Sequence, residues 1–183
     1  MIRARWDPAR VLSCALLLGL AGHACSAPVK DDRVVVHAPG SKQFALVGVM
    51  LDRSCGTLDC HGSRQRNFRL YGQSGMRLQE PDLPGASETT AAELEANYHS
   101  VVGQEPEILT SVVHDNGAHP ERLTIVRKAR DAEFHLGGRI FEVGDDEDVC
   151  FSSWLTGRVD EAACIRAIKA IDPLLDTPPK PPP

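Results

Sequence analysis

The stretch Arg53–Gly62, with the sequence RSCGTLDCHG, places four residues between Cys55 and Cys60 and sets His61 directly after the second cysteine. Two thiols and an imidazole so close together have three plausible uses. They can attach a haem, bind a zinc or copper ion with a distant histidine, or close a small disulfide loop beside an incidental histidine. The interpretation of this stretch therefore governs the interpretation of the whole chain.

The residues around this stretch have mainly helical patterns. Ahead of it, apolar residues at helical spacing predict a helix that begins at a capping Ser41 and delivers Cys55 at its end. A long loop rich in Gly, Pro and Gln follows over residues 62–88. The further helices that we predict run from the capping box at Thr90 to Val102, and over Pro106–Val113, Pro120–Lys128, Asp145–Leu155 and Asp160–Ile171. Short strands at Arg33–His37 and Arg139–Val143 leave room for one short β-hairpin, so we expect a mainly α domain with long loops.

The N-terminus has the pattern of a secretory signal. Met1–Arg10 is basic, and Val11–Ala21 is an uncharged apolar run too short for a permanent membrane span. Cys25 follows a small residue, as at the cleavage site of bacterial lipoproteins. We expect a signal peptide over residues 1–24, a lipid on Cys25, and an exported protein anchored on the periplasmic side or in the outer membrane of the cell envelope. Plain secretion and an uncleaved anchor are the alternatives.

The rest of the 183-residue chain reads as a tether over residues 25–40, one domain over residues 41–172, and a disordered proline-rich tail over residues 173–183. The net charge of −5 argues against a nucleic-acid partner, which needs clustered Lys and Arg. The basic patch Arg64–Arg69 is the exception. It is either a solvated loop or a set of counter-charges for haem propionates.

Cysteine usage fits an oxidising compartment. Of six cysteines, Cys14 leaves with the signal peptide and Cys25 would carry lipid. The remaining four form two local groups, Cys55 with Cys60 and Cys150 with Cys164. We expect a Cys150–Cys164 disulfide that joins two consecutive antiparallel helices, while Cys55 and Cys60 form either a second disulfide or part of a cofactor site.

Covalent haem attachment needs two thiols that reach the vinyl groups of one porphyrin and an imidazole that reaches the iron. The stretch from Cys55 to His61 provides these groups, and it resembles the Cys-x4-Cys-His variant attachment motif of multihaem c-type cytochromes. An apolar helix that runs into a Cys-His-Gly triplet is similar to the first segment of many cytochrome c domains, including those of large envelope proteins from planctomycetes and myxobacteria.

The second half of the chain extends this resemblance, which covers residues 42–158. Segments similar to conserved patterns of such domains are Pro120–Lys128 (PERLTIVRK), His135–Gly138 (HLGG) and Trp154–Gly157 (WLTG). The resemblance implies a small cytochrome c-like helical domain with one covalent haem c. It implies thioethers at Cys55 and Cys60 and iron ligation by His61.

For the sixth iron ligand we favour His135, because the paired glycines after it let the backbone approach a flat macrocycle, with Met76 as second choice. The implied function is electron transfer with an unidentified redox partner protein, and the protein itself need not be an enzyme. No catalytic residues are predicted. The alternative is a cofactor-free, disulfide-stapled envelope lipoprotein that acts as a binding or structural module.

Overall fold

The computed structural model describes residues 35–79 and 83–172. The expected signal peptide, Cys25 and the proline-rich tail therefore lie outside the described residues, as does most of the tether. In chain order the elements are the 3₁₀ helix η1 (Ser41–Phe44), α2 (Ala45–Cys55), α3 (Ala91–Val102), α4 (Pro106–His114), the 3₁₀ helix η2 (Pro120–Arg122), α5 (Thr124–Ala129), α6 (Asp146–Leu155) and α7 (Glu161–Ile171). The described part contains helices and no strands, so the expectation of a mainly α fold is confirmed. None of these helices is both long and apolar enough to cross a membrane.

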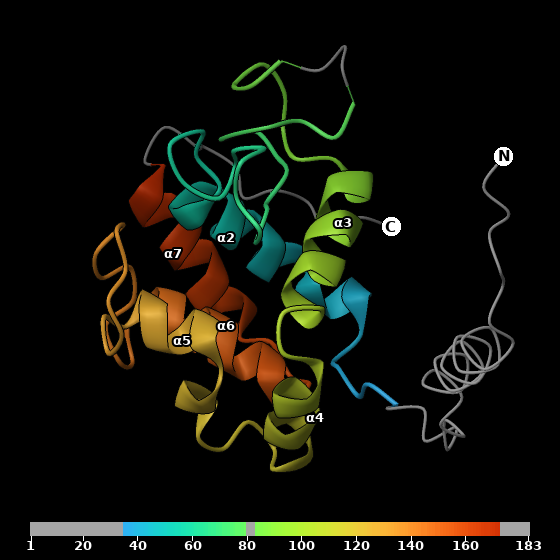
Figure 1. Ribbon diagram of the computed structural model, residues 1–183, viewed down its shortest axis with the longest axis vertical. Coiled ribbons are helices and arrows are strands. Elements are labelled where there is room, and N and C mark those ends of the chain that lie inside the picture. Colours follow the sequence, from blue (N-terminus) through green and yellow to red (C-terminus); the bar gives the residue numbers. More distant parts are fainter. Residues whose placement is uncertain (1–34, 80–82, 173–183) are drawn as a thin grey trace, which may run out of the picture. The chain divides into compact units, whose positions relative to one another are not determined.

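Helix α2 is the centre of the core. Every residue from Ala45 to Asp52 is buried, because α3 packs on one side of the helix and α6 and α7 pack on another (Figure 1). A Cβ atom at Gly48 would lie 2.8 Å from a methyl carbon of Leu94, so the glycine permits the close approach of α2 and α3. The ring of Phe44 contacts Tyr98 and Trp154 edge to face and joins α3 to α6.

Helices α6 and α7 form an antiparallel hairpin that packs on α2. A disulfide between Cys150 and Cys164 joins them, with both residues fully buried, and this confirms the predicted pairing. For a loop of this length the crosslink contributes about 3 kcal/mol by restricting the unfolded chain. The side chains of Asp145 and Asp160 cap the two helices, and the cap at Asp160 agrees with the sequence prediction.

Two helix starts differ from the prediction. The segment over Ser41–Phe44 is a 3₁₀ turn without a side-chain cap, so the expected capping role of Ser41 is wrong. The predicted helix over Pro120–Lys128 is interrupted at Leu123, whose backbone is extended. The Glu105 carboxylate accepts hydrogen bonds there from the Thr124 amide and hydroxyl at 2.6 and 2.8 Å, and a distant side chain thereby starts α5.

The predicted strand at Arg139–Val143 is also wrong. The amides of Ile140 and Phe141 both donate to the carbonyl of Ala129, at 2.7 and 2.9 Å, so this segment is bound to the end of α5 rather than to a partner strand. The other predicted strand, Arg33–His37, is described only from Val35 onward, and its described residues form no strand. Phe141 is buried in the core nevertheless.

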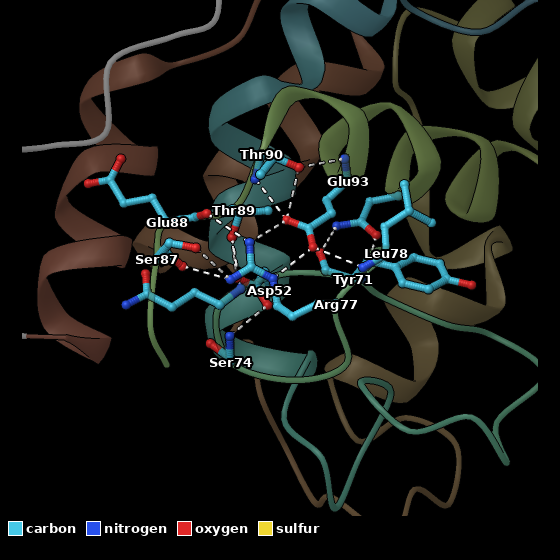
Figure 2. A network of polar contacts seen from close by, with 12 residues as sticks. Asp52, Tyr71, Ser74, Arg77, Leu78, Ser87, Glu88, Thr89, Thr90 and Glu93 are labelled. Carbon is cyan, nitrogen blue, oxygen red and sulfur yellow. Dashed lines mark hydrogen bonds and ion pairs between the residues drawn. The ribbon is translucent and has the colours of Figure 1, made fainter. Parts of the chain in front are cut away.

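The long loop after α2 is held by a buried polar network (Figure 2). Arg77 and Glu93 form a bidentate ion pair at 2.8 and 2.9 Å, and both side chains are almost fully buried. Glu93 also accepts from Thr90 in the capping box of α3, which confirms that prediction. Asp52 accepts from the Thr89 hydroxyl and the Ser74 amide. The loop thus takes a defined path without regular structure of its own.

Replacing Arg77 with Leu should lower the free energy of unfolding by about 3–5 kcal/mol, because Glu93 would keep a buried charge without its partner. Urea denaturation of the full chain measures this. The double variant Arg77→Leu/Glu93→Leu should recover part of the loss. Arg166→Leu removes an exposed pair with Asp146 and is the matched control, which should lose much less stability than Arg77→Leu does. Equal losses for Arg77→Leu and Arg166→Leu would contradict the role assigned to the buried pair.

Asp52 provides a prediction with a defined pH dependence. Burial raises its pKa above 3.8, and the hydrogen bond from Thr89 and the charge of Arg53 oppose this only in part. The stability that protonated Asp52 provides is therefore present below pH 3.8 and is lost as the pH rises through the folded-state pKa. Asp52→Asn should gain stability relative to the wild type between about pH 4 and about pH 7, measured by urea denaturation.

The control for this prediction is Asp146→Asn, because the pKa of Asp146 is shifted in the opposite direction from that of Asp52. The hydrogen bond from Arg166 lowers the pKa of Asp146, so this carboxylate contributes above its unfolded-state pKa. Asp146→Asn should be slightly less stable than the wild type by an amount that stays nearly constant from about pH 5 to about pH 7 and shrinks as the pH falls below 3.8. If the stability difference from the wild type had the same pH dependence in both variants, the raised pKa assigned to Asp52 would be wrong.

Candidate functional site

The turn after α2 brings the first cysteine and the histidine of the motif together. Cys55 is the last residue of α2, and its carbonyl accepts a hydrogen bond from the His61 amide at 2.9 Å. Between them, the amides of Cys60 and Gly62 both donate to the carbonyl of Thr57. The four residues between the cysteines therefore wind into a compact turn, and the longer spacing does not separate Cys55 from His61.

Glycines hold this turn against the following loop. A Cβ atom on Gly62 or on Gly75 would overlap the carbonyl oxygen of Gly56, at a distance that no side chain tolerates. The carbonyl of Gly62 accepts from the Met76 amide, and the carbonyl of His61 accepts from the Leu70 amide, both at 2.9 Å. The position of His61 is thus determined by backbone contacts on both of its sides.

The rings of His61 and His135 lie side by side. Their centroids are 6.0 Å apart and their planes differ by 15°. His61 comes from the turn after α2, and His135 from the loop between α5 and α6. Residues far apart in the sequence thus form a histidine pair.

Each ring of this pair is oriented by a backbone carbonyl. Nδ1 of His61 lies 3.1 Å from the carbonyl oxygen of Phe68, and Nδ1 of His135 lies 3.1 Å from that of Gly138. Because a carbonyl only accepts hydrogen bonds, Nδ1 must carry the proton in both rings. In the neutral rings Nε2 then has a free lone pair, which is the state of a histidine ready to bind a metal ion.

The electrostatics of His61 favour this neutral state. Burial lowers the pKa of His61, the hydrogen bond to Phe68 opposes that effect, and the nearby His135 and Arg66 lower the pKa further. His61 therefore remains neutral to a lower pH than an exposed histidine does. A neutral imidazole has the lone pair that ligation requires.

A cavity of about 380 Å³ adjoins the histidine pair, and Cys55, His61 and His135 all line it. This volume lies within the range of small-molecule and cofactor sites. Most of the wall is apolar and comes from Leu51, Phe68, Ile125, Ala129, Ile140 and Phe141. Arg66 and Lys128 add positive charges, so the cavity can take a largely apolar ligand that also has negatively charged groups.

Cys55 and Cys60 are free thiols in the structure, rather than a disulfide. Burial, and to a smaller extent the neighbouring Cys60, raises the pKa of the Cys55 thiol to about 12. Within the described residues no group of three or more His, Cys, Asp and Glu side chains is placed to hold a metal ion. The four-ligand zinc or copper site considered from the sequence is therefore not assembled in this part of the chain.

The structure places Met76 elsewhere. Met76 lines a separate cavity with Leu58 and Arg64, on the other side of the Gly62 backbone from the histidine pair. Of the basic patch, Arg66 lines the cavity beside His61, whereas Arg64 lines the one beside Met76. Among the candidate iron ligands named from the sequence, His135 is the one that the fold brings next to His61.

Several residues of the site were not identified from the sequence. Phe68 orients His61 through its carbonyl and contacts its ring at a centroid distance of 4.8 Å, while Ile140 and Phe141 form part of the cavity wall. For Ile140 and Phe141, the available sequence signal was the apolar content of Arg139–Val143, which we interpreted as a strand. Lys128 was placed on a helix but not at a site, because helical periodicity does not reveal which neighbour a side chain meets.

Comparison with family models, with curated proteins and with solved structures finds no match to this chain.

The two free thiols should react at different rates in haem-free protein. Because burial raises the pKa of Cys55 to about 12, it holds almost no thiolate at neutral pH, and thiolate is the form that iodoacetamide alkylates. We expect Cys55 to react at least about tenfold more slowly than Cys60 near pH 8, as measured by peptide mass spectrometry. Urea should remove the difference. Equal rates in the folded protein would show that Cys55 is not shielded as described.

Proposed function

We propose that this chain is a c-type haem protein in which Cys55 and Cys60 form thioethers, His61 and His135 are the axial iron ligands, and the function is electron transfer. The observation that carries the proposal is the histidine pair, which lies beside a mainly apolar cavity lined by Cys55, whereas Cys60 is not part of the lining. The resemblance of the sequence to cytochrome c domains points to the same residues.

The centroid separation of the histidine pair matches that of two imidazoles bound on opposite sides of one metal ion. With metal–nitrogen bonds of about 2 Å and about 1 Å from each nitrogen to its ring centre, two such imidazoles have centroids about 6 Å apart. The observed separation is 6.0 Å, and the rings are nearly parallel. A porphyrin supplies four nitrogens itself, so two protein ligands complete a six-coordinate iron.

The cavity supports the same cofactor. Its apolar wall would shield the macrocycle from water, and Arg66 and Lys128 would face the negatively charged propionates. Arg66 donates to the carbonyls of Cys60 and Asp59, at 3.3 and 3.2 Å, which holds its guanidinium near the attachment turn. Lys128 shares its charge with Glu133, so Arg66 is the stronger candidate for a propionate partner.

A bound haem would supply an iron that changes valence, and the chain would set its environment. His61 and His135 would provide two nitrogen ligands, and two histidines favour a lower potential than a histidine with a methionine. The hydrogen bonds to the carbonyls of Phe68 and Gly138 would keep both rings in the ligating tautomer. The protein would act as an electron carrier, with a redox partner still to be identified.

We also propose that the protein is exported and anchored in the cell envelope by a lipid on Cys25. The basic start and apolar run of residues 1–24 support this, together with the small residue before the cysteine. The thioethers and the Cys150–Cys164 disulfide fit such an oxidising compartment.

The test is production of the full chain in a bacterial host with haem-attachment machinery. We expect a red protein whose haem resists acid–acetone extraction, with an intact mass equal to the processed chain plus one haem and one lipid anchor. Cys55→Ala/Cys60→Ala should lose the covalent haem, because no thiol remains for the vinyl groups. His135→Ala should keep the covalent haem but lose the spectrum of a six-coordinate iron with two histidines.

The controls for this experiment are Met76→Leu and His99→Ala. His99 is an exposed histidine paired with Glu95, and both variants should keep the wild-type spectrum. Colourless wild-type protein from a host that matures another c-type cytochrome in parallel would refute the proposal. That result would favour the cofactor-free lipoprotein, with the apolar cavity as its binding site.

A further inference from the structure

The two histidines of the pair are held very differently, and the difference begins with the His61 segment. The His61 amide donates to Cys55, and its carbonyl accepts from Leu70, so both of its peptide groups are bonded to the fold. Gly62 is buried and packed on the backbone of Gly56. Displacing His61 would require this turn and the end of the buried helix α2 to move together.

The segment that carries His135 is an exposed loop with mainly local bonds. The residues on either side of it, Phe134 and Leu136, are 80% and 81% exposed. The His135 carbonyl accepts from the Gly138 amide, and the His135 ring bonds to the Gly138 carbonyl, so these contacts move with the loop. The loop is tied to α5 at the surface, where the Lys128 ammonium donates to the Phe134 carbonyl and Glu133 forms exposed ion pairs with Arg127 and Lys128.

Backbone dihedrals mark both ends of this segment. Asp131 and Gly138 have φ angles of 58° and 71°, in the left-handed region that breaks the helical path of the chain. Beyond Gly138, the amides of Ile140 and Phe141 return to the end of α5. The His135 loop is therefore anchored at the end of α5 and at the hydrogen bonds of Ile140 and Phe141 to Ala129. Between these two anchors the loop can move away from the cavity while the rest of the cavity wall stays in place.

We propose that His135 is an exchangeable ligand and that this site binds small uncharged iron ligands, of which carbon monoxide is a probe. The inference rests on the proposed haem function and extends it from electron transfer to ligand binding. Exchange breaks the bond between iron and His135 Nε2 and forms a bond from iron to the carbon of carbon monoxide. Each bond uses the lone pair of its own ligand, so no electron or proton is transferred.

The chemistry of the cavity selects this class of ligand. Leu51, Ile125, Ile140 and Phe141 offer apolar contacts and no hydrogen-bond donor from their side chains. A small neutral molecule loses little hydration on entering this apolar part of the wall, and the proposed propionates would pair with the charged residues Arg66 and Lys128 that also line the cavity. His61 remains bound on the opposite side of the iron.

The test is stopped-flow mixing of the ferrous holoprotein with carbon monoxide, followed in the Soret region. We expect complete binding at a rate that reaches a plateau at high carbon monoxide concentration, because departure of His135 becomes limiting. His135→Ala should bind at least about tenfold faster, with a rate that increases linearly with concentration. Amide hydrogen exchange of the wild type without carbon monoxide should be faster at residues 132–138 than at residues 57–62.

A pair of glycine variants tests whether the loop sets the rate. Gly138→Ala places an L-residue at positive φ within the His135 loop and should raise the plateau rate about three- to tenfold, since loop release relieves the strain. Gly157→Ala introduces a similar strain at the end of α6, where φ is 74° and the space around the new Cβ is open. It should leave the plateau rate unchanged.

The outcomes separate this inference from the function on which it rests. A colourless protein refutes the haem proposal itself. A red protein with two histidine ligands that does not bind carbon monoxide at saturating concentration overturns the exchange proposal. That result leaves the proposed electron-transfer function unaffected. A linear rate in the wild type, or equal plateau rates in the wild type and Gly138→Ala, would also overturn it.

Discussion

The site depends on one short backbone connection, the hydrogen bond from the His61 amide to the carbonyl of Cys55 at the end of α2. Because α2 is buried along most of its length, this bond transmits the rigidity of the core directly to the histidine. The close contact of Gly62 and Gly75 with the carbonyl of Gly56 fixes the other side of the turn. Side chains at these glycines would push the turn away from α2 and His61 away from the cavity.

The remainder of the fold supports that arrangement in two ways. The Cys150–Cys164 disulfide and the aromatic contacts of Trp154 stabilise the helical hairpin on which α2 packs. The buried pair of Arg77 and Glu93 and the carboxylate of Asp52 hold the long loop, which has no regular structure of its own. The polar network thus fixes the path of the loop, as apolar packing fixes the positions of the helices. Its charges are tolerated in the interior because each is hydrogen-bonded.

The cavity lies between α5, the end of α2 and the loops that follow these two helices. The segment from Arg139 to Val143 is bound to the end of α5 and leaves space between Ile140, Phe141 and the turn after α2. Into this space project one firmly held histidine and one on an exposed loop. The proposed attachment at His61 and the proposed exchange at His135 both follow from this contrast.

Local signals in the sequence were enough to determine the helix pattern, the capping residues Thr90 and Asp160, and the Cys150–Cys164 pairing, because each depends on neighbours a few residues away. They did not reveal the break at Leu123, which a carboxylate from Glu105 creates across the fold, or the strand-like segment that forms no strand. The proposed attachment motif consists of Cys55, Cys60 and His61, which are close neighbours in the sequence. The position of His135 beside His61, the distance of Met76 from it and the shape of the cavity were decided only by the tertiary structure, because contacts between distant segments depend on how the core packs.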